Sequence, residues 1–416
     1  MMTKDEALAA LAAHAPGRRR PALVPLANCA GRGVAEDLAA PFDFPPFDKA
    51  VMDGWAVRSA DAAAPVSLAV AGRITAGETG TPLRAGTAVK IMTGAPLPPD
   101  ADAVLQVEES ELASDGETVA LRKGVRPWLN TARRGEDWRR GDVVVPRGTR
   151  IDATVQALVA MLGLDPVPSY ALPTVCVVPT GDELVPPGSA TVPPGGIFES
   201  NGTLVTALLR ETLPDLRPTC PGIAPDERRA LGAFLDVGTA HDVLILSGGV
   251  SMGDLDLVAP MLKERGLVPT IEKVAIKPGK PFLFGDVRRA DGGVCTVFGL
   301  PGNPVSSCVT FELFVKPWLR SVVGVVDGPV GRATAVFAPA TPLKAIPRTQ
   351  HVPVRITVVD GRATAVPVRW NGSGDLRGLA AADGLAVIPA GVAGEPGSVV
   401  EIEPIGHRSF RAGTGA

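Results

Sequence analysis

The fold is decided by the stretch VLILSGGVS at residues 243–251. Its first four residues are all aliphatic, as in a strand that is covered on both faces of a parallel sheet. The glycines that follow let backbone N–H groups approach an anion closely, and the serines add donors. Because open α/β sheets bind ligands beyond the carboxyl ends of their strands, we expect a binding loop at Ser247, Gly248, Gly249 and Ser251.

The same pattern continues on both sides of this stretch. Strand-like segments at 174–178 and 294–300 alternate with helix-like segments at 202–212, 226–236 and 305–316. This order predicts βαβ units and a parallel sheet.

Each strand-like segment is followed by a loop that carries candidate ligand contacts. The first loop, TGDEL at 180–184, delivers two acids, and the second continues from the Gly-Gly pair to Asp254 and Asp256. A Gly-Gly pair alone often marks only a tight turn, so these acids favour a site. The third loop, GLPGNP at 299–304, leads into a helix whose N-terminus can hold an anion.

Two lysines, Lys277 and Lys280, stand in the segment IKPGKP at 276–281, where prolines restrict the backbone. Fixed lysines of this kind indicate phosphate contacts. Acids beside a phosphate site would repel the ligand unless a divalent cation intervened, and oxygen ligands favour Mg²⁺ over zinc. The predicted reaction class is metal-assisted cleavage of a phosphoanhydride.

The remaining chain divides into β-rich modules around this α/β domain. We expect a linker or dimerisation domain at 1–49 and 138–172, with capped helices at 3–14 and 153–162, and an inserted β-rich domain at 50–137. The α/β domain spans 173–325, and a small β-barrel without helices follows at 326–416. The expected fold class is a multidomain α/β plus β protein.

Composition excludes several classes of function. The 416 residues carry a net charge of −3, which argues against a nucleic-acid binder. No stretch reaches the ~20 apolar residues of a membrane span, and the N-terminus is not a signal peptide, so we expect a cytoplasmic protein. The five cysteines form no C-x-x-C motif and the four histidines no ligand pair, which indicates reduced thiols and no zinc site.

The inserted module carries three glycine-containing loops, two of them with acids beside the glycine: FDKAVMDGWA at 47–56, IMTGAP at 91–96 and RRGED at 133–137. Each could be a turn or a surface charge cluster when taken alone. Their recurrence in one module suggests that it faces the α/β cleft, with the site between domains or between subunits.

Together these motifs resemble the molybdopterin molybdenumtransferase family, which includes the MoeA-type bacterial enzymes and the gephyrin E domain. The match runs along nearly the whole chain. The resemblance implies a homodimer of four-domain subunits, with a cleft formed by the molybdopterin-binding domain of one subunit and the β-rich module of the other. It further implies adenylylated molybdopterin and molybdate as substrates, Mg²⁺ as cofactor, and AMP as a product.

Residues are carried over from the family where the motifs match. The catalytic positions that this implies are Asp53, Thr93, Asp137, Glu183, Asp226 and Asp256. The implied substrate contacts are Ser247, Gly248, Gly249, Ser251, Lys277, Lys280, Pro301, Gly302, Asn303, Pro304 and Ser373, and the implied metal ligands are Asp137, Glu183, Asp254 and Asp256. The chain departs from the family at Lys49, usually small and polar, and at Trp55, usually Tyr.

Two other functions fit parts of the pattern. A molybdopterin adenylyltransferase uses a related domain with the same Gly-Gly loop, although the extra modules disfavour it. A non-catalytic dimeric scaffold resembling the gephyrin E domain is the other alternative, against which the retained acids argue. Further partners implied by the family are the adenylyltransferase and apo-molybdoenzymes.

Overall fold

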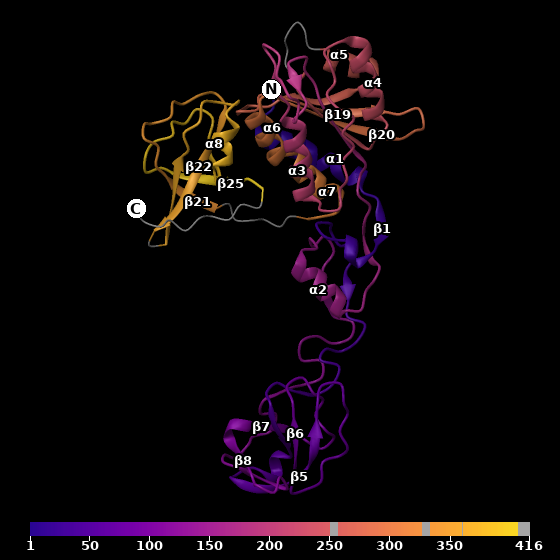
Figure 1. Ribbon diagram of the computed structural model, residues 1–416, viewed down its shortest axis with the longest axis vertical. Coiled ribbons are helices and arrows are strands. Elements are labelled where there is room, and N and C mark those ends of the chain that lie inside the picture. Colours follow the sequence, from indigo (N-terminus) through magenta and orange to yellow (C-terminus); the bar gives the residue numbers. More distant parts are fainter. Residues whose placement is uncertain (250–256, 327–332, 360, 407–416) are drawn as a thin grey trace. The chain divides into compact units, whose positions relative to one another are not determined.

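A computed structural model describes residues 1–249, 257–326, 333–359 and 361–406. The predicted site residues Ser251, Asp254 and Asp256 lie outside these ranges. The chain forms two compact units (Figure 1). The first unit comprises Met1–Glu36, Arg147–Ala160 and Leu164–Ala416, and the second comprises Asp37–Pro146 and Met161–Gly163.

The centre of the first unit is a five-stranded sheet with the order β13-β16-β20-β19-β17. Its parallel strands are β13 (Val175–Pro179), β16 (Val243–Ser247) and β20 (Val294–Leu300). The sheet is extended by two antiparallel strands, β19 (Pro281–Arg288) and β17 (Val268–Lys273). The predicted strands at 243–247 and 294–300 are therefore confirmed, within a sheet that is mixed rather than wholly parallel.

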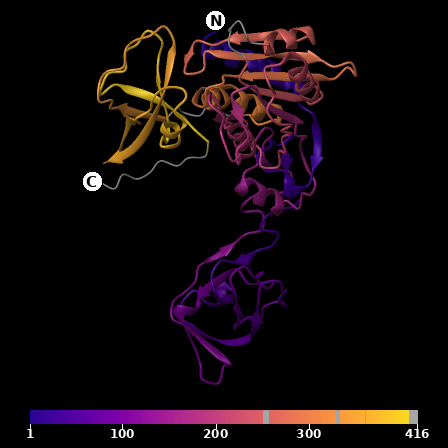
Figure 2. The ribbon, with the colours of Figure 1, turned by 45° about the horizontal axis from the view of Figure 1, so that its top comes forward.

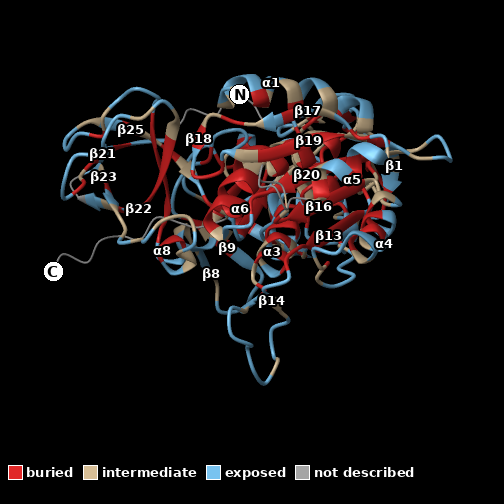
Figure 3. Cartoon of the chain, turned by 90° about the horizontal axis from the view of Figure 1, so that it is seen from above, coloured by how far each residue is buried: buried red, intermediate tan, exposed pale blue. Residues whose placement is uncertain are grey.

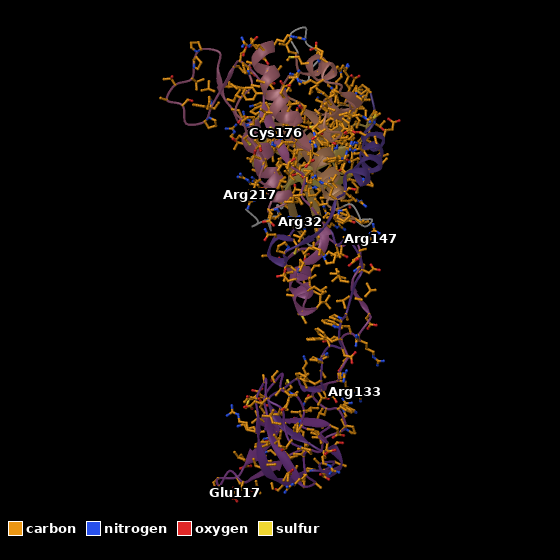
Figure 4. The ribbon with its side chains drawn as sticks, turned by 90° about the vertical axis from the view of Figure 1, so that its right-hand side faces the viewer. Arg32, Glu117, Arg133, Arg147, Cys176 and Arg217 are labelled. Carbon is orange, nitrogen blue, oxygen red and sulfur yellow. The ribbon has the colours of Figure 1, made fainter. Side chains whose placement is uncertain are left out.

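Helices cover both faces of this sheet because its strands are apolar on both sides. Val177 and Ile245 face a core shared with α1 (Lys4–His14), α3 (Asn201–Thr212), α6 (Pro304–Thr310) and α7 (Lys316–Val322). The alternate residues Cys176 and Leu244 face α4 (Arg228–Thr239) and α5 (Val258–Glu264). Figure 3 shows the buried strands in red, and Figure 4 labels Cys176 among them.

The predicted helices form with adjusted boundaries. Thr3 and Glu6 make the reciprocal hydrogen bonds of a capping box at the start of α1. The Asp152 side chain accepts the Val155 N–H at the start of α2 (Ala153–Met161). The single helix predicted at 305–316 is instead α6, a π-helical turn at Phe311–Val315 and α7, whose Pro317 lacks an N–H to continue the ladder.

The C-terminal part of the first unit is a closed β-barrel (Figure 2). Its strand order is β18-β22-β23-β21-β25-β24, and β22 also pairs with β24. The strands are β18 (Ile276–Lys277), β21 (Ala333–Phe337), β22 (Thr349–Val359), β23 (Arg362–Pro367), β24 (Gly384–Ile388) and β25 (Val399–Pro404). Because β18 leaves the α/β domain to pair with β22, it joins the barrel to the sheet domain.

The prediction that the C-terminal domain has no helices is wrong. A helix of one turn, α8 (Leu376–Ala380), begins where the Asp375 side chain accepts the Gly378 N–H. Five residues are too short to produce a helical hydrophobic pattern in the sequence, which explains why it was not predicted.

The second unit contains a six-stranded sheet with the order β7-β4-β6-β5-β9-β8. Its strands are β4 (Gly54–Val57), β5 (Val66–Ile74), β6 (Thr87–Ile91), β7 (Ala103–Gln106), β8 (Ser110–Leu112) and β9 (Thr118–Leu121). The indole N–H of Trp55, in its core, donates to Ser110 Oγ at 3.0 Å. Tryptophan at position 55, where the family usually has tyrosine, therefore makes a partly buried hydrogen bond of its own.

Short two-stranded ribbons complete the fold. They are formed by β1 (Pro21–Val24) with β12 (Val167–Tyr170), β2 (Leu38–Ala39) with β11 (Val143–Val145), β3 (Lys49–Ala50) with β10 (Thr131–Ala132), and β14 (Leu184–Val185) with β15 (Ile197–Phe198). Among the described residues, no helix has the length and apolar character needed to span a bilayer.

Candidate functional site

A cavity of 1170 Å³ opens in the first unit at the carboxyl ends of β13, β16 and β20. Its other side is formed by the loop after β18 and by loops of the barrel. Twelve of the residues predicted from the sequence line it: Glu183, Asp226, Ser247, Gly248, Gly249, Lys277, Lys280, Pro301, Gly302, Asn303, Pro304 and Ser373. Motifs that lie far apart in the chain are therefore brought together around one cavity.

The floor of the cavity is held by hydrogen bonds between its three strand-end loops. The Thr180 N–H donates to Ser247 O at 2.9 Å, and the Gly248 N–H donates to Leu300 O at 3.1 Å. The Asn201 side-chain amide donates to Ser247 Oγ at 2.9 Å and to Gly302 O at 2.7 Å. These contacts fix the loops before a ligand arrives.

The Gly-Gly turn has no room for side chains. Gly248 has φ +95°, and a Cβ there would lie 2.6 Å from Thr180 O. Gly249 has φ +61°, and its Cβ would lie 2.4 Å from a methyl carbon of Val258. Both positions require glycine, because the backbone has a positive φ and a Cβ would clash. Since both glycines line the cavity and carry no side chain, their backbone is open to a ligand.

One wall of the cavity is acidic. A Cβ on Gly181 would lie 2.4 Å from Glu183 Oε2, so this carboxylate sits directly over the turn. The Asp226 N–H donates to Asp182 Oδ1 at 3.0 Å. Burial raises the pKa of Asp226, and the nearby charges of Asp182 and Glu183 raise it further. Such crowding of carboxylates is relieved by a bound cation.

Glu199, which the motif analysis missed, also lines the cavity, and it is only 7% exposed. Its carboxylate accepts the Gly202 N–H at 2.6 Å, at the start of α3. Because this oxygen satisfies a helix N-terminus, the side chain has a structural role that its position in the sequence did not reveal.

Another part of the lining, which we call the basic wall, carries Lys277, Lys280 and Arg348. Lys277 and Lys280 are exposed, and neither forms an ion pair or side-chain hydrogen bond with another residue that the structure describes. Arg348 joins them, and its guanidinium donates to Ile276 O at 3.3 Å. The Val305 N–H donates to Ser373 O at 3.0 Å, which ties the barrel loop to the start of α6. These cations and donors suit an anionic ligand.

Several buried polar atoms of the cavity lining lack a partner among the described residues. They are Thr180 Oγ1, Asn201 Oδ1 and both ring nitrogens of His351. Burial lowers the pKa of His351 to about 3, so its ring stays neutral at physiological pH. Unsatisfied groups of this kind are costly unless a ligand or water completes them, so the lining fits a polar ligand.

The second unit brings together the three loops predicted around Asp53, Thr93 and Asp137. The Gly94 N–H donates to Ala50 O at 2.8 Å, and the Val51 N–H donates to Asn130 O at 3.0 Å. Strands β3 and β10 pair between these loops. The predicted residues of this unit therefore belong to one assembled surface.

Two hydrogen bonds hold the carboxylate of Asp53 in place on that surface. The hydroxyl and the backbone N–H of Thr93 both donate to its Oδ1, at 2.6 and 2.7 Å. These hydrogen bonds lower the pKa of Asp53. Asp137 is exposed, and its backbone N–H donates to Phe44 O at 3.0 Å.

A complete metal site is not formed by the residues that the structure describes. Within the described ranges, no three side chains of His, Cys, Asp or Glu come together as metal ligands. Glu183 and Asp226 supply two carboxylates on one wall, and Asp254 and Asp256 lie outside the described residues. The acidic wall is thus a partial set of oxygen ligands, which suits Mg²⁺ because this ion keeps several waters.

The fold and the cavity together describe an α/β protein whose strand-end loops, with residues of the barrel, line a cavity suited to an anionic ligand. Comparison with known families is consistent with this class. Residues 2–163 match the MoeA N-terminal region (domain I and II), residues 176–321 match a probable molybdopterin binding domain, and residues 340–405 match the MoeA C-terminal region (domain IV).

Curated relatives narrow the assignment. A molybdopterin molybdenumtransferase of Haemophilus influenzae is 37% identical over 329 residues, which cover 78% of each chain. Molybdopterin molybdenumtransferase 2 of Mycobacterium tuberculosis is 36% identical over 388 residues, 90% of this chain and 92% of the relative. The chain therefore belongs to the molybdopterin molybdenumtransferase family, a family of transferases.

A solved structure supports the fold. The molybdopterin biosynthesis MoeA protein from Pyrococcus horikoshii superimposes with a TM-score of 0.73 at 33% identity. The match covers 97% of this chain and 99% of that one. The expected multidomain α/β plus β architecture is thus confirmed.

Proposed function

We propose that this chain inserts molybdate into adenylylated molybdopterin and releases AMP in a Mg²⁺-dependent reaction in the cytoplasm. The observation that carries the proposal is the division of one cavity into an acidic wall around Glu183 and Asp226 and a basic wall around Lys277 and Lys280. A substrate that carries phosphates, reacting with an oxyanion beside a divalent cation, needs both kinds of wall.

The basic wall is proposed to hold the anionic groups. Lys277, Lys280 and Arg348 present cationic donors to the cavity, and Ser373 adds a hydroxyl from the barrel. Neither Lys277 nor Lys280 forms an ion pair with a carboxylate that the structure describes. These residues would position the phosphoanhydride and the incoming molybdate near one another, which lowers the entropic cost of their reaction.

The acidic wall is proposed to hold Mg²⁺. Glu183 and Asp226 would bind it, with Asp254, Asp256 and Asp137 as the further predicted ligands. When bound, the ion would stabilise the charge that develops on the phosphoanhydride as it breaks. The raised pKa of Asp226 fits this assignment, because a cation offsets the repulsion that causes it.

The rigid floor is proposed to orient the substrate. Thr180 Oγ1 can donate to the ligand, and Asn201 Oδ1 can accept from it. The open backbone of Gly248 and Gly249 allows close approach of an anionic group.

Asp53, Thr93 and Asp137 are proposed to act from the second unit of a partner subunit in a homodimer. The Thr93 hydrogen bonds keep Asp53 ionised and fixed in orientation, so it can accept a hydrogen bond from the substrate without losing its own position.

The direct test is AMP release from adenylylated molybdopterin by the purified enzyme. We expect release only when molybdate and Mg²⁺ are both present. No AMP under those conditions would contradict the proposal. Pyrophosphate released from molybdopterin and ATP would instead identify an adenylyltransferase.

A further inference from the structure

A second groove, of 510 Å³, lies on the outer face of the barrel, apart from the cavity described above. It runs between strands β22 and β23 and helix α8. We call it the arginine groove, and its lining residues are Arg355, Thr357, Val366, Pro367, Val368, Arg369, Arg377, Gly378 and Ala381.

Strand alternation explains why charged residues stand here. Val354 and Ile356 are buried in the barrel core, so Arg355 between them points to the outer face. Arg355 pairs with Val366 across the β22–β23 ladder, which places a cation beside an exposed apolar side chain. The groove therefore combines charge with an apolar floor.

The three arginines of the groove form no ion pair with the residues that the structure describes. Arg355, Arg369 and Arg377 are exposed, and none forms a side-chain hydrogen bond with another described residue. Asp375 lies close enough for the charge of Arg377 to lower its pKa, but its two oxygens accept the N–H groups of Asn371 and Gly378. Within the described chain, the guanidinium groups of the groove therefore keep their donors available to a ligand.

The spacing of these cations favours an extended ligand. Arg355 lies opposite Val366 on the neighbouring strand. The backbone stays alongside β22 as far as Val368, whose N–H donates to Pro353 O at 3.0 Å. Arg369 is three residues beyond Val366, about 10 Å along the strand direction at ~3.3 Å per residue. Cations spread over this length, beside the apolar side chains of Val366 and Pro367, match an extended segment that carries several acids and an apolar residue.

We propose that the arginine groove docks an extended acidic segment of a partner protein. Carboxylates of the segment pair with Arg355, Arg369 and Arg377, and an apolar side chain between them packs on Val366 and Pro367. This docking does not depend on the transferase function proposed above.

Fluorescence anisotropy with labelled synthetic peptides tests the proposal on the full chain. The first peptide has glutamates on both sides of a leucine, the second replaces the glutamates by glutamine, and the third replaces the leucine by glycine. We expect saturable binding of the first peptide, at least tenfold weaker binding of the other two, and weaker binding as salt rises.

Charge reversal tests the location. The double variant Arg355→Glu/Arg377→Glu should weaken binding of the first peptide at least tenfold. The matched control Arg362→Glu, on the same barrel but outside the groove, should change it less than twofold. If the reversed variant is less stable by circular dichroism, Arg355→Gln/Arg377→Gln provides a milder test, with an intermediate loss expected.

Several outcomes would overturn the proposal. These are the absence of saturable binding, equal binding of the glutamine peptide, or an equal loss in the Arg362 control. Tight binding of inorganic pyrophosphate that displaces the peptide, without dependence on leucine, would show a small-anion site instead. AMP release by the same variants should stay at the wild-type rate, so a failure here is distinct from a failure of the proposed reaction.

Discussion

The two acidic regions of the chain differ in what surrounds their carboxylates. Asp226, in the cavity of the first unit, is largely exposed but lies beside Asp182 and Glu183, and desolvation and these two charges raise its pKa. Asp53, in the second unit, accepts two hydrogen bonds from Thr93, and its pKa is lowered. Among the residues that the structure describes, the carboxylate of Asp226 has no ion-pair partner, whereas the carboxylate of Asp53 is already satisfied by donors.

The contrast indicates two different roles for an aspartate carboxylate. A crowded carboxylate gains most from a cation, which suits a metal ligand. A carboxylate held by donors stays ionised in a fixed orientation, which suits contact with the substrate. The predictions below test each half of the contrast.

The largest effect is expected at Asp53. Asp53→Ala should lower the rate of AMP release at least 100-fold, because it removes the carboxylate that Thr93 orients. The thermal midpoint should change little, because Asp53 is exposed. Steady-state kinetics and a thermal melt measure both, with Glu117→Gln, another exposed acid of the second unit, as control. A wild-type rate in Asp53→Ala would remove its catalytic assignment.

The next largest effect is expected on the basic wall. Lys277→Ala and Lys280→Ala should each raise the KM for molybdate or substrate by about tenfold, the loss of one charge-assisted contact. Lys263→Ala, at an exposed ion pair with Glu272, is the control. A change in kcat alone would mean that the lysines act in the chemical step rather than in binding.

An effect on stability is expected at the Gly-Gly turn. Gly249→Ala should lower the free energy of unfolding by about 1–3 kcal/mol, because it adds a clash with Val258 to a left-handed backbone. Gly266→Ala has a similar φ of +85° but open space around it, so it should lose only about 1 kcal/mol. Urea unfolding compares the two, and equal losses would show that packing contributes nothing.

The smallest effect is expected at Asp226. Its folded pKa lies above its unfolded value, so ionisation at neutral pH destabilises the folded state, and the penalty disappears as pH falls below the unfolded pKa. Without divalent cations, Asp226→Asn should therefore raise the free energy of unfolding at pH 7 by only about a few tenths of a kcal/mol, because the group is largely exposed. A thermal melt should show this as a slightly higher midpoint. The gain should vanish at pH 3, and Mg²⁺ should stabilise the wild type more than the variant.

The pKa of Asp53 is shifted in the opposite direction, so its effect on stability also depends on pH in the opposite way. Its folded pKa is lowered, so its contribution to stability is present above the unfolded pKa and is lost as pH falls through the folded pKa. Carboxyl NMR titration should show Asp53 titrating below the usual range and Asp226 above it. The reverse order would contradict the comparison on which the two roles rest.

The sequence was most informative where chemistry and local geometry coincide. The loops around Glu183, Ser247 and Pro301 follow strands of the sheet and line one cavity, as expected for apolar strands followed by glycine and polar residues. Lys277 and Lys280 line the same cavity, and the prolines of their segment drew attention to them, but their binding role stays a prediction.

Tertiary contacts supplied what the sequence could not. Arg348 lines the cavity because β18 leaves the sheet domain to pair with β22. No local sequence pattern predicts that strand pairing. Asn201 was missed because it looks like an ordinary helix start until its amide is seen to bridge Ser247 and Gly302.

We propose that the basic wall of the cavity binds the anions and that the acidic wall binds the cation. A crystal structure of this chain soaked with AMP, molybdate and Mg²⁺ tests it most directly. We expect oxyanion density against Lys277, Lys280 and Ser373, and a cation within coordination distance of Glu183 or Asp226. Anions bound at the Glu183 side, or ligand density only outside this cavity, would contradict it.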